Sequence, residues 1–404
     1  MPEAVIVSTA RSPIGRANKG SLKDMRPDDL TATIVQAALA KIPELDPKQI
    51  DDLYLGCGLP GGESGFNMAR IVSVLMGFDH LPGATITRYC SSSVQTTRMA
   101  FHAIKAGEGD VFVSAGVETV SRFGNGTSDV PGTQNPAFGD AMSRTTQTAQ
   151  GGVDWHDPRE DGTLPDAYIA MGQTAENVAR LRGLSRQELD EFGVRSQNLA
   201  EKAIDAGFWA REITPVTTPD GTEVSKDDGP RAGVTLEGVS DLKPVFRPDG
   251  VVTAGNCCAL NDGAAAVVVM SDTKARELGL TPLARIVSTG VTALSPEIMG
   301  LGPVEASKQA LARANMTIDD IDLVEINEAF AAQVVPSYQD LGIDLDRLNV
   351  NGGAIAVGHP FGMTGARLQA TMLNSLDWHD KTTGLVTMCV GGGQGMALIL
   401  ERMS

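Results

Sequence analysis

The alternation of short apolar strands with helical patterns at both ends of the chain constrains the fold most. Residues 4–8 form a β-branched apolar run typical of a buried strand. A helical pattern follows over residues 27–41, and another strand is expected at residues 52–56. The last third repeats this order, with strand, helix and strand patterns at residues 285–289, 303–314 and 323–326. Strands that alternate with helices predict an α/β fold with a largely parallel sheet.

The middle of the chain differs from both ends in its composition and periodicity. Residues 121–168 are rich in Gly, Pro, Asp and Thr and show little periodicity. Ser185 and Glu188 then form a capping box, S-x-x-E, which predicts the start of a helix that runs to about Ala206. Residues 219–230 are polar again. We therefore predict that the middle third is inserted, with loops and a few helices lying over a core that the two ends build.

Length and charge narrow the choice of partners. A chain of 404 residues can form two or three compact units. The net charge is −17 and only 4% of residues are aromatic, so nucleic acid and anionic membranes are poor partners. A small phosphorylated ligand remains compatible, because a few Lys or Arg side chains can line one groove. No segment approaches the ~18 uninterrupted apolar residues of a membrane span, and the first residues do not resemble a leader peptide.

The cysteines predict neither a disulfide framework nor a metal site. Their number is odd and their spacing is irregular, at Cys57, Cys90, Cys257, Cys258 and Cys389. The adjacent pair does not match the C-x-x-C spacing of metal ligands. We therefore expect free thiols, no metal and a reducing, cytoplasmic location.

Two stretches of the chain resemble each other weakly. Cys90 starts a helix-like run, and the strand that follows it ends at Gly116. His359 starts a similar run, and the strand that follows ends at Cys389. Two similar halves would explain this, although every α/β protein repeats its units to some degree.

Cys90 is a candidate nucleophile. In TRYCSSSVQTTRMAFHAIKAG it lies between an extended segment and a helix, followed by the small residues Ser91, Ser92 and Ser93. The first turn of a helix has unpaired N–H groups and a partial positive charge, which are expected to lower the pKa of a thiol there. The alternative is a buried structural cysteine, the commoner state of a free cysteine.

His359 is a candidate general base. Five glycines surround it in NVNGGAIAVGHPFGMTGAR, and Pro360 suits the first position of a helix. A glycine-rich loop keeps bulk away from the imidazole and holds it at the mouth of a helix, where it can exchange protons. The alternative is a histidine that only caps or fills a turn.

Two further stretches place polar groups at strand ends. Cys389 ends a strand in LVTMCVGGGQG, before a glycine turn whose N–H groups can form an oxyanion hole. Its thiol can also serve as an acid or base, or it is simply a core cysteine. In EINEAFAA, Asn327 and Glu328 follow a strand and are expected to begin a helix with Asn327 as the N-cap.

Taken together, these stretches resemble the thiolase family. The resemblance runs from TARSPIGR, residues 9–16, to LILE, residues 398–401, which is essentially the whole chain. The block NEAFA…NGGAIAVGHPFGMTGAR…CVGGGQG is its most specific part. It implies a five-layered αβαβα core of two similar halves with an inserted loop domain that binds coenzyme A. The implied division is residues 1–120 plus 251–272, the insert 121–250, and residues 273–404. It also implies a homodimer or homotetramer.

The resemblance assigns chemical roles to the polar residues. Cys90 matches the nucleophile that accepts the acyl group, and His359 matches the base that activates it. Cys389 matches the cysteine that exchanges a proton with the α-carbon of acetyl-CoA. Asn327 matches the residue that holds a water in one oxyanion hole, and the N–H groups of Cys90 and Gly391 match the other. The implied activity is an acetyl-CoA C-acyltransferase that cleaves or forms 3-oxoacyl-CoA thioesters, as in fatty acid β-oxidation.

The resemblance also implies a coenzyme A site without any permanently bound cofactor. Arg231 matches a basic residue near the adenine nucleotide. The pantetheine arm is expected along Met171, Phe246, Ala254, Cys258 and Phe330.

Four positions depart from the usual family pattern. The family often has Ser in place of Cys258, and a thiol is a poorer hydrogen-bond partner than a hydroxyl. Ala170, Thr87 and Ser93 stand where many relatives have His, Asn and Gly. These differences leave the chemistry unchanged and the preferred acyl group open.

Two other functions compete with this one. A 3-oxoacyl synthase-like condensing enzyme would share the fold, but Cys389 as a second cysteine argues against it. A non-catalytic acyl-CoA-binding protein would be expected to have lost Cys90, His359 or Cys389, and all three are present.

Overall fold

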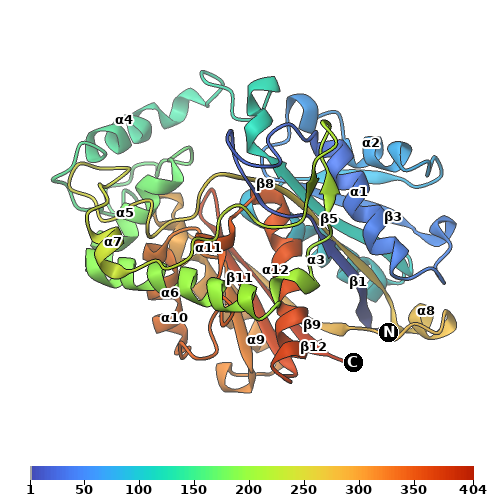
Figure 1. Ribbon diagram of the computed structural model, residues 1–404. Helices are drawn as coiled ribbons and strands as arrows, with labels where there is room; N and C mark the ends of the chain where they lie inside the picture. Colours follow the sequence, from blue (N-terminus) through green and yellow to red (C-terminus); the bar gives the residue numbers. More distant parts are fainter. Residues whose placement is uncertain (1) are drawn as a thin grey trace.

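A computed structural model describes residues 2–404 and contains one large mixed sheet (Figure 1). The strand order is β10-β11-β12-β9-β1-β8-β5-β3-β4, with β2 beside β8. The N-terminal group of strands consists of β1 (Ala4–Arg11), β2 (Gly15–Arg16), β3 (Asp52–Cys57), β4 (Gly83–Ile86), β5 (Val111–Thr119) and β8 (Asn261–Ser271). The C-terminal group consists of β9 (Ala284–Ala293), β10 (Leu323–Ile326), β11 (Thr383–Val390) and β12 (Gln394–Arg402).

The two groups of strands meet at a narrow junction. Strands β1 and β9 pair only through Val5 and Ile6, which lie opposite Arg285 and Ala284. Every other strand pair of this sheet lies within one of the two groups. The sheet is therefore two halves joined by a short ladder, in line with the weak internal repeat.

The prediction of a largely parallel sheet is wrong. Pairs β3–β4, β3–β5 and β10–β11 are parallel, whereas β8 and β12 run antiparallel to their neighbours. The tight turn Gly391–Gly393 joins β11 to β12, and a short turn forces antiparallel pairing. Strand β8 instead enters the sheet after the long middle segment, so no short crossover helix fixes its direction.

Helices cover both faces of each half and fill the space between them. Helices α1 (Pro27–Ala40) and α2 (Met68–Leu75) pack on the outer face of the N-terminal strands. Helices α3 (Ser92–Ala106) and α12 (Phe361–Trp378) pack together at the centre, and α9 (Gly302–Ala314) and α10 (Ala331–Leu341) lie outside the C-terminal strands. This gives the predicted five layers, αβαβα.

The sequence of β8 explains why layers form on both sides. Its residues are all buried, and they alternate between two apolar cores. Ala265, Val267 and Val269 face the central core beside α3 and α12. Ala264, Ala266 and Val268 face the outer core beside α1 and α2. A strand with a continuous run of small and β-branched apolar residues is suited to this two-sided burial.

The middle of the chain forms helices and loops over one side of the core (Figure 1). They comprise α4 (Gly139–Thr148), α5 (Met171–Leu181), α6 (Arg186–Asp205), α7 (Leu236–Ser240) and the hairpin β6 (Val216–Thr217) and β7 (Glu223–Val224). The capping box of Ser185 and Glu188 forms as predicted at the start of α6. Whether residues 121–250 fold as a separate unit stays a prediction. Among the described residues, no helix is long and apolar enough to cross a membrane.

Candidate active site

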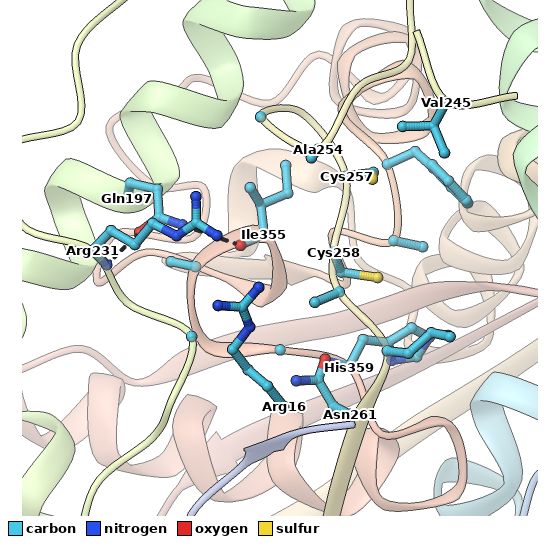
Figure 2. A pocket seen from close by; sticks show the side chains of 18 of the residues that line it. Arg16, Gln197, Arg231, Val245, Ala254, Cys257, Cys258, Asn261, Ile355 and His359 are labelled. Atoms are coloured by element: carbon cyan, nitrogen blue, oxygen red, sulfur yellow. Dashed lines mark hydrogen bonds between the residues drawn. The ribbon is translucent and has the colours of Figure 1, made fainter. Parts of the chain in front are cut away.

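A cavity of about 790 Å³ lies between the middle segment and the glycine-rich C-terminal loops (Figure 2). Cys90 and His359 both line it. So do all the residues for which a coenzyme A contact is predicted, namely Met171, Arg231, Phe246, Ala254, Cys258 and Phe330. Residues from distant parts of the chain thus meet at one site, while their individual roles stay predictions.

Cys90 lies in a tight turn at the start of α3. Tyr89, just before it, has a left-handed φ of 42°, which is uncommon for a residue with a side chain. The thiol is buried, and burial raises its pKa to about 11 although the N–H groups of Gly391 and Cys90 favour the thiolate. The predicted low pKa is therefore wrong. Desolvation of the anion outweighs the helix terminus here.

His359 is buried and held in one orientation. Its Nδ1 lies 2.6 Å from Thr364 Oγ1, and its backbone N–H donates to Asn261 Oδ1 at 2.9 Å. Thr364 Oγ1 already donates to the Pro360 carbonyl at 2.6 Å, so it accepts a hydrogen bond from the Nδ1–H group of His359. This assigns the lone pair to Nε2, which accepts a long hydrogen bond from Asn327 Nδ2 at 3.4 Å. Burial, with the nearby charge of Arg367, lowers the pKa of His359 to about 3, so the imidazole is neutral.

Asn327 reaches the site from an irregular segment that follows β10, not from a helix cap. The prediction that it begins a helix is wrong, because α10 starts only at Ala331. The helix is delayed because Phe330, which is extended, forms a bridge with Cys257, and the N–H of Cys258 donates to the Ala329 carbonyl. The amide oxygen Oδ1 of Asn327 is buried without a hydrogen-bond partner among the described residues. It is available to a water or substrate.

Glu328 holds the segment that carries Asn327 in place through buried hydrogen bonds. Its carboxylate accepts hydrogen bonds from Ser196 Oγ at 2.6 Å, Asn349 Nδ2 at 2.8 Å and the backbone N–H of Ile355 at 3.0 Å. A buried carboxylate with three donors is a rigid support. The arrangement ties the loop of Asn327 to helix α6 and to the segment before His359.

Cys389 and Gly391 lie at the end of β11, behind Cys90. Cys389 is fully buried, and burial together with the neighbouring Cys90 thiol raises its pKa well above the usual range. Gly391 directs its N–H toward the sulfur of Cys90. Gly392 and Gly393 follow with φ of 76° and 78°, a conformation that favours glycine. Gly392 and Gly393 are therefore needed to turn the chain beside the thiol.

Comparison with known proteins decides the family. The chain matches the thiolase N-terminal domain over residues 4–273 and the thiolase C-terminal domain over residues 280–402. The chain belongs to the thiolase family. The predicted family and its enzyme class, the acyltransferases, are thereby confirmed.

Individual relatives match over their full length. The chain is 42% identical to 3-ketoacyl-CoA thiolase from Idiomarina loihiensis, with 100% of both chains covered. It is 41% identical to 3-ketoacyl-CoA thiolase from Bacillus subtilis, covering 99% of this chain and 100% of the relative.

Solved thiolase-family structures confirm the fold class. The acetyl-CoA acetyltransferase of Bacillus anthracis superposes with a TM-score of 0.86 at 38% identity, covering 100% of this chain and 99% of the other. The dimeric peroxisomal thiolase of Saccharomyces cerevisiae gives a TM-score of 0.88 at 34% identity, covering 99% and 97%.

Three supporting residues of this thiolase-family site were not predicted from the sequence. Thr364 and Asn261 orient His359, as described above. Glu118, at the end of β5, accepts from the N–H groups of Gly58 at 2.7 Å and Gly362 at 2.8 Å. Burial raises the pKa of Glu118 to about 7 against the effect of these donors. The only sequence indication was a carboxylate at the end of a buried strand.

Two arginine side chains give one side of the thiolase-family cavity a positive charge. Arg16 and Arg231 are the only charged side chains among its described lining residues. Within residues 2–404 no group of three or more His, Cys, Asp or Glu side chains is arranged to hold a metal ion. At the inner end of the cavity, where Cys90 and His359 lie, the groups that can take part in a reaction are therefore thiols, an imidazole, an amide and backbone N–H groups.

Proposed function

We propose that the chain is an acetyl-CoA C-acyltransferase that cleaves 3-oxoacyl-CoA with coenzyme A, or forms it in reverse, through an acyl-enzyme on Cys90. One observation carries the proposal. A buried thiol and a neutral imidazole whose Nε2 is a hydrogen-bond acceptor line the same, mainly apolar cavity. The names of the full-length relatives, 3-ketoacyl-CoA thiolases, support the substrate class.

In the first step, His359 Nε2 takes the proton of the Cys90 thiol as the sulfur attacks the 3-keto carbon. The new oxyanion is stabilised by the N–H groups of Cys90 and Gly391. A thiol with a pKa of about 11 is a stronger nucleophile once deprotonated than an acidic thiol, although it needs a base at the moment of attack. A neutral His359 supplies that base.

The carbon–carbon bond then breaks, and acetyl-CoA leaves as its enolate. Protonated His359 and a water held by Asn327 stabilise the enolate oxygen, and Cys389 gives its proton to the carbon. In the second step the Cys389 thiolate takes the proton of an incoming coenzyme A thiol, which attacks the acyl-enzyme. Cys90 leaves and recovers its proton from His359, so the enzyme returns to its starting state.

The remaining lining residues hold coenzyme A. Met171, Phe246, Ala254 and Phe330 provide apolar walls for the pantetheine arm, and Cys258 lies beside its amides. Arg231 binds the nucleotide half. Coenzyme A is a substrate in this scheme, and no permanently bound cofactor takes part.

The proposal also covers the cellular setting, the assembly and the domain division of the chain. We propose a role in β-oxidation in the cytoplasm and a homo-oligomeric assembly, a dimer or a tetramer. The yeast neighbour is a dimeric thiolase. We also propose the division into residues 1–120 plus 251–272, the insert 121–250, and residues 273–404.

A labelling experiment tests the central claim. After brief exposure to acetyl-CoA, peptide mass spectrometry should find one acetyl group on Cys90. Label on Cys57 or Cys257 with none on Cys90 would refute the acyl-enzyme. Thiolysis rates measured against 3-oxoacyl-CoA chain length, with a bulky ring-bearing thioester included, then define the acyl preference and separate this activity from simple acyl-CoA binding.

A further inference from the structure

Arg16 lines the same cavity as Arg231 but comes from a different part of the chain. It is the last residue of β2, where it lies opposite Asn261 of β8. Figure 2 shows its guanidinium directed into the cavity, on the side occupied by Arg231, with Cys258 and His359 on the other side. Two cations that converge on one side of a cavity can bind a polyanion together.

The backbone of Arg16 is fixed. Its N–H donates to Asp228 Oδ2 at 2.9 Å, and its carbonyl accepts from the N–H of Gly20 at 2.7 Å. Asn261 donates from Nδ2 to the Gly15 carbonyl at 3.0 Å. The side chain therefore starts from a rigid position, and only its own rotamers remain to be ordered by a ligand.

The nearby carboxylates are already occupied. Asp227 accepts from both terminal nitrogens of Arg11, at 2.6 and 3.0 Å, and from the N–H of Ile14 at 2.7 Å. Asp228 Oδ2 accepts from the N–H groups of Arg16 and Ser21. Among the described residues, the guanidinium of Arg16 has no hydrogen bond or ion pair of its own.

This arrangement is unusual for a chain with a net charge of −17. An Arg in a strongly acidic protein normally finds a carboxylate. Here the described cavity lining contains two Arg and no Asp or Glu. The local potential therefore opposes that of the whole molecule, and a ligand that carries several negative charges would be bound selectively here.

We propose that Arg16 is a second cationic residue of the coenzyme A site and binds a phosphate group of its nucleotide half together with Arg231. The inference rests on the proposed function. Coenzyme A carries a diphosphate and a separate 3′-phosphate, and a guanidinium matches the geometry of phosphate oxygens. Arg16 touches no reacting atom, so its contribution is to affinity.

Equilibrium binding measures this contribution without turnover. Coenzyme A, dephospho-coenzyme A and pantetheine are titrated by calorimetry into Cys90→Ala protein with or without Arg16→Gln. The added substitution should weaken coenzyme A binding roughly 5- to 20-fold and leave pantetheine binding unchanged, because pantetheine has no phosphate. An equal loss with dephospho-coenzyme A assigns Arg16 to the diphosphate. A loss confined to coenzyme A assigns it to the 3′-phosphate.

Two variants serve as controls. Lys19→Gln removes a charge from the exposed turn that follows β2, at a position outside the cavity lining, and it should change coenzyme A affinity less than 2-fold. Arg16→Lys keeps the charge without the planar fork and should lose less affinity than Arg16→Gln.

Two results would overturn the proposal. Unchanged coenzyme A binding in Arg16→Gln would show that Arg16 does not contact the ligand. Equal weakening of pantetheine binding would show that Arg16 only supports Asn261 and, through it, the backbone of His359. Either result leaves the proposed function standing, because acetylation of Cys90 is tested separately.

Discussion

The two ends of the cavity differ in their electrostatics. At the inner end, Cys90 and His359 are buried and uncharged at neutral pH, since burial moves their pKa values to about 11 and about 3. At the outer side, Arg16 and Arg231 carry permanent charge, and neither forms an ion pair with a described residue. One end is neutral until it reacts, and the other is charged before any ligand arrives.

We expect the uncharged inner end to determine the reaction rate and the charged outer side to determine the affinity for coenzyme A. Uncharged groups in a dry site can exchange a proton at the moment of reaction without first shedding water. Charged groups near solvent bind phosphates equally well in the ground state and the transition state, which changes KM more than kcat. Substitutions at the inner end should therefore act on kcat, and substitutions at the outer side on KM.

Cys90→Ser should give the largest loss. A hydroxyl has a much higher pKa than a thiol, so His359 cannot generate an equivalent nucleophile. We expect kcat for acetoacetyl-CoA thiolysis to fall roughly 10⁴-fold or more, as for other covalent nucleophiles. Initial rates and acetyl labelling measure this. Cys257→Ser, which changes another cysteine of the cavity lining, should retain most activity. Comparable losses in both variants would contradict the assignment of Cys90 as the nucleophile.

Cys389→Ala should separate acyl loading from carbon–carbon chemistry. The general acid–base role predicts a loss of about 10²- to 10⁴-fold in thiolysis. Cys90 should still be acetylated by acetyl-CoA, since His359 is intact. Exchange of the acetyl-CoA methyl protons with deuterated water should stop. If exchange and thiolysis both continue near wild-type rates, Cys389 is only a core cysteine and the condensing-enzyme alternative gains support.

The pH dependence of alkylation tests whether the inner end is neutral. Below a pKa of about 11 the thiolate fraction of Cys90 rises tenfold per pH unit. Its reaction with iodoacetamide should therefore keep accelerating between pH 7 and pH 10, with a total increase of about 10²- to 10³-fold. A free small thiol with an ordinary pKa of about 8.5 should level off above pH 9. A plateau for Cys90 near pH 7 would mean that the helix terminus outweighs burial.

Features that depend on neighbouring residues could be predicted from the sequence, whereas the pKa of Cys90 could not. Residues 323–326 are a strand with the predicted limits, and the capping box of Ser185 opens α6 as predicted, because both depend on local patterns. The pKa of Cys90 depends on burial by segments far away in the chain, so the local helix argument gave the wrong sign. Asn327 failed as an N-cap for the same reason, since its neighbours pair with residues 257 and 258.

In the candidate site, too, some residues could be identified from local sequence and others only from distant contacts. The motif patterns singled out Cys90 and His359, and the resemblance to the thiolase family supplied the six predicted coenzyme A contacts. The fold brings all eight residues to one cavity. Arg16 escaped notice because nothing in its neighbouring sequence distinguishes it from a surface arginine. Only the occupied state of Asp227 and Asp228, more than 200 residues away, makes its free guanidinium informative.

Arg231→Gln should show the outer-side pattern. Arg231 lies in the cavity lining, and its backbone N–H donates to Gln197 Oε1 at 3.0 Å, so the loop should survive loss of the side chain. We expect the KM for coenzyme A to rise about 5- to 20-fold while kcat changes less than 2-fold. Steady-state rates at varied coenzyme A concentration measure both. A large fall in kcat at constant KM would break the division between the two sides.

Cys258→Ser should produce the smallest change, and in the opposite direction. Cys258 lies in the cavity wall, where its backbone N–H donates to the Ala329 carbonyl at 3.1 Å, and burial raises its pKa so that it stays a neutral thiol. A thiol is a weak hydrogen-bond donor, whereas a hydroxyl of similar size is a strong one. If pantetheine amides pass this residue, the serine variant should lower the KM for coenzyme A about 2- to 5-fold, the value of one modest neutral hydrogen bond. Cys258→Ala removes the polar atom and should leave KM unchanged or slightly raised. A lower KM in both variants would point to relief of crowding by the sulfur, and a fall in kcat would place Cys258 with the reacting groups of the inner end.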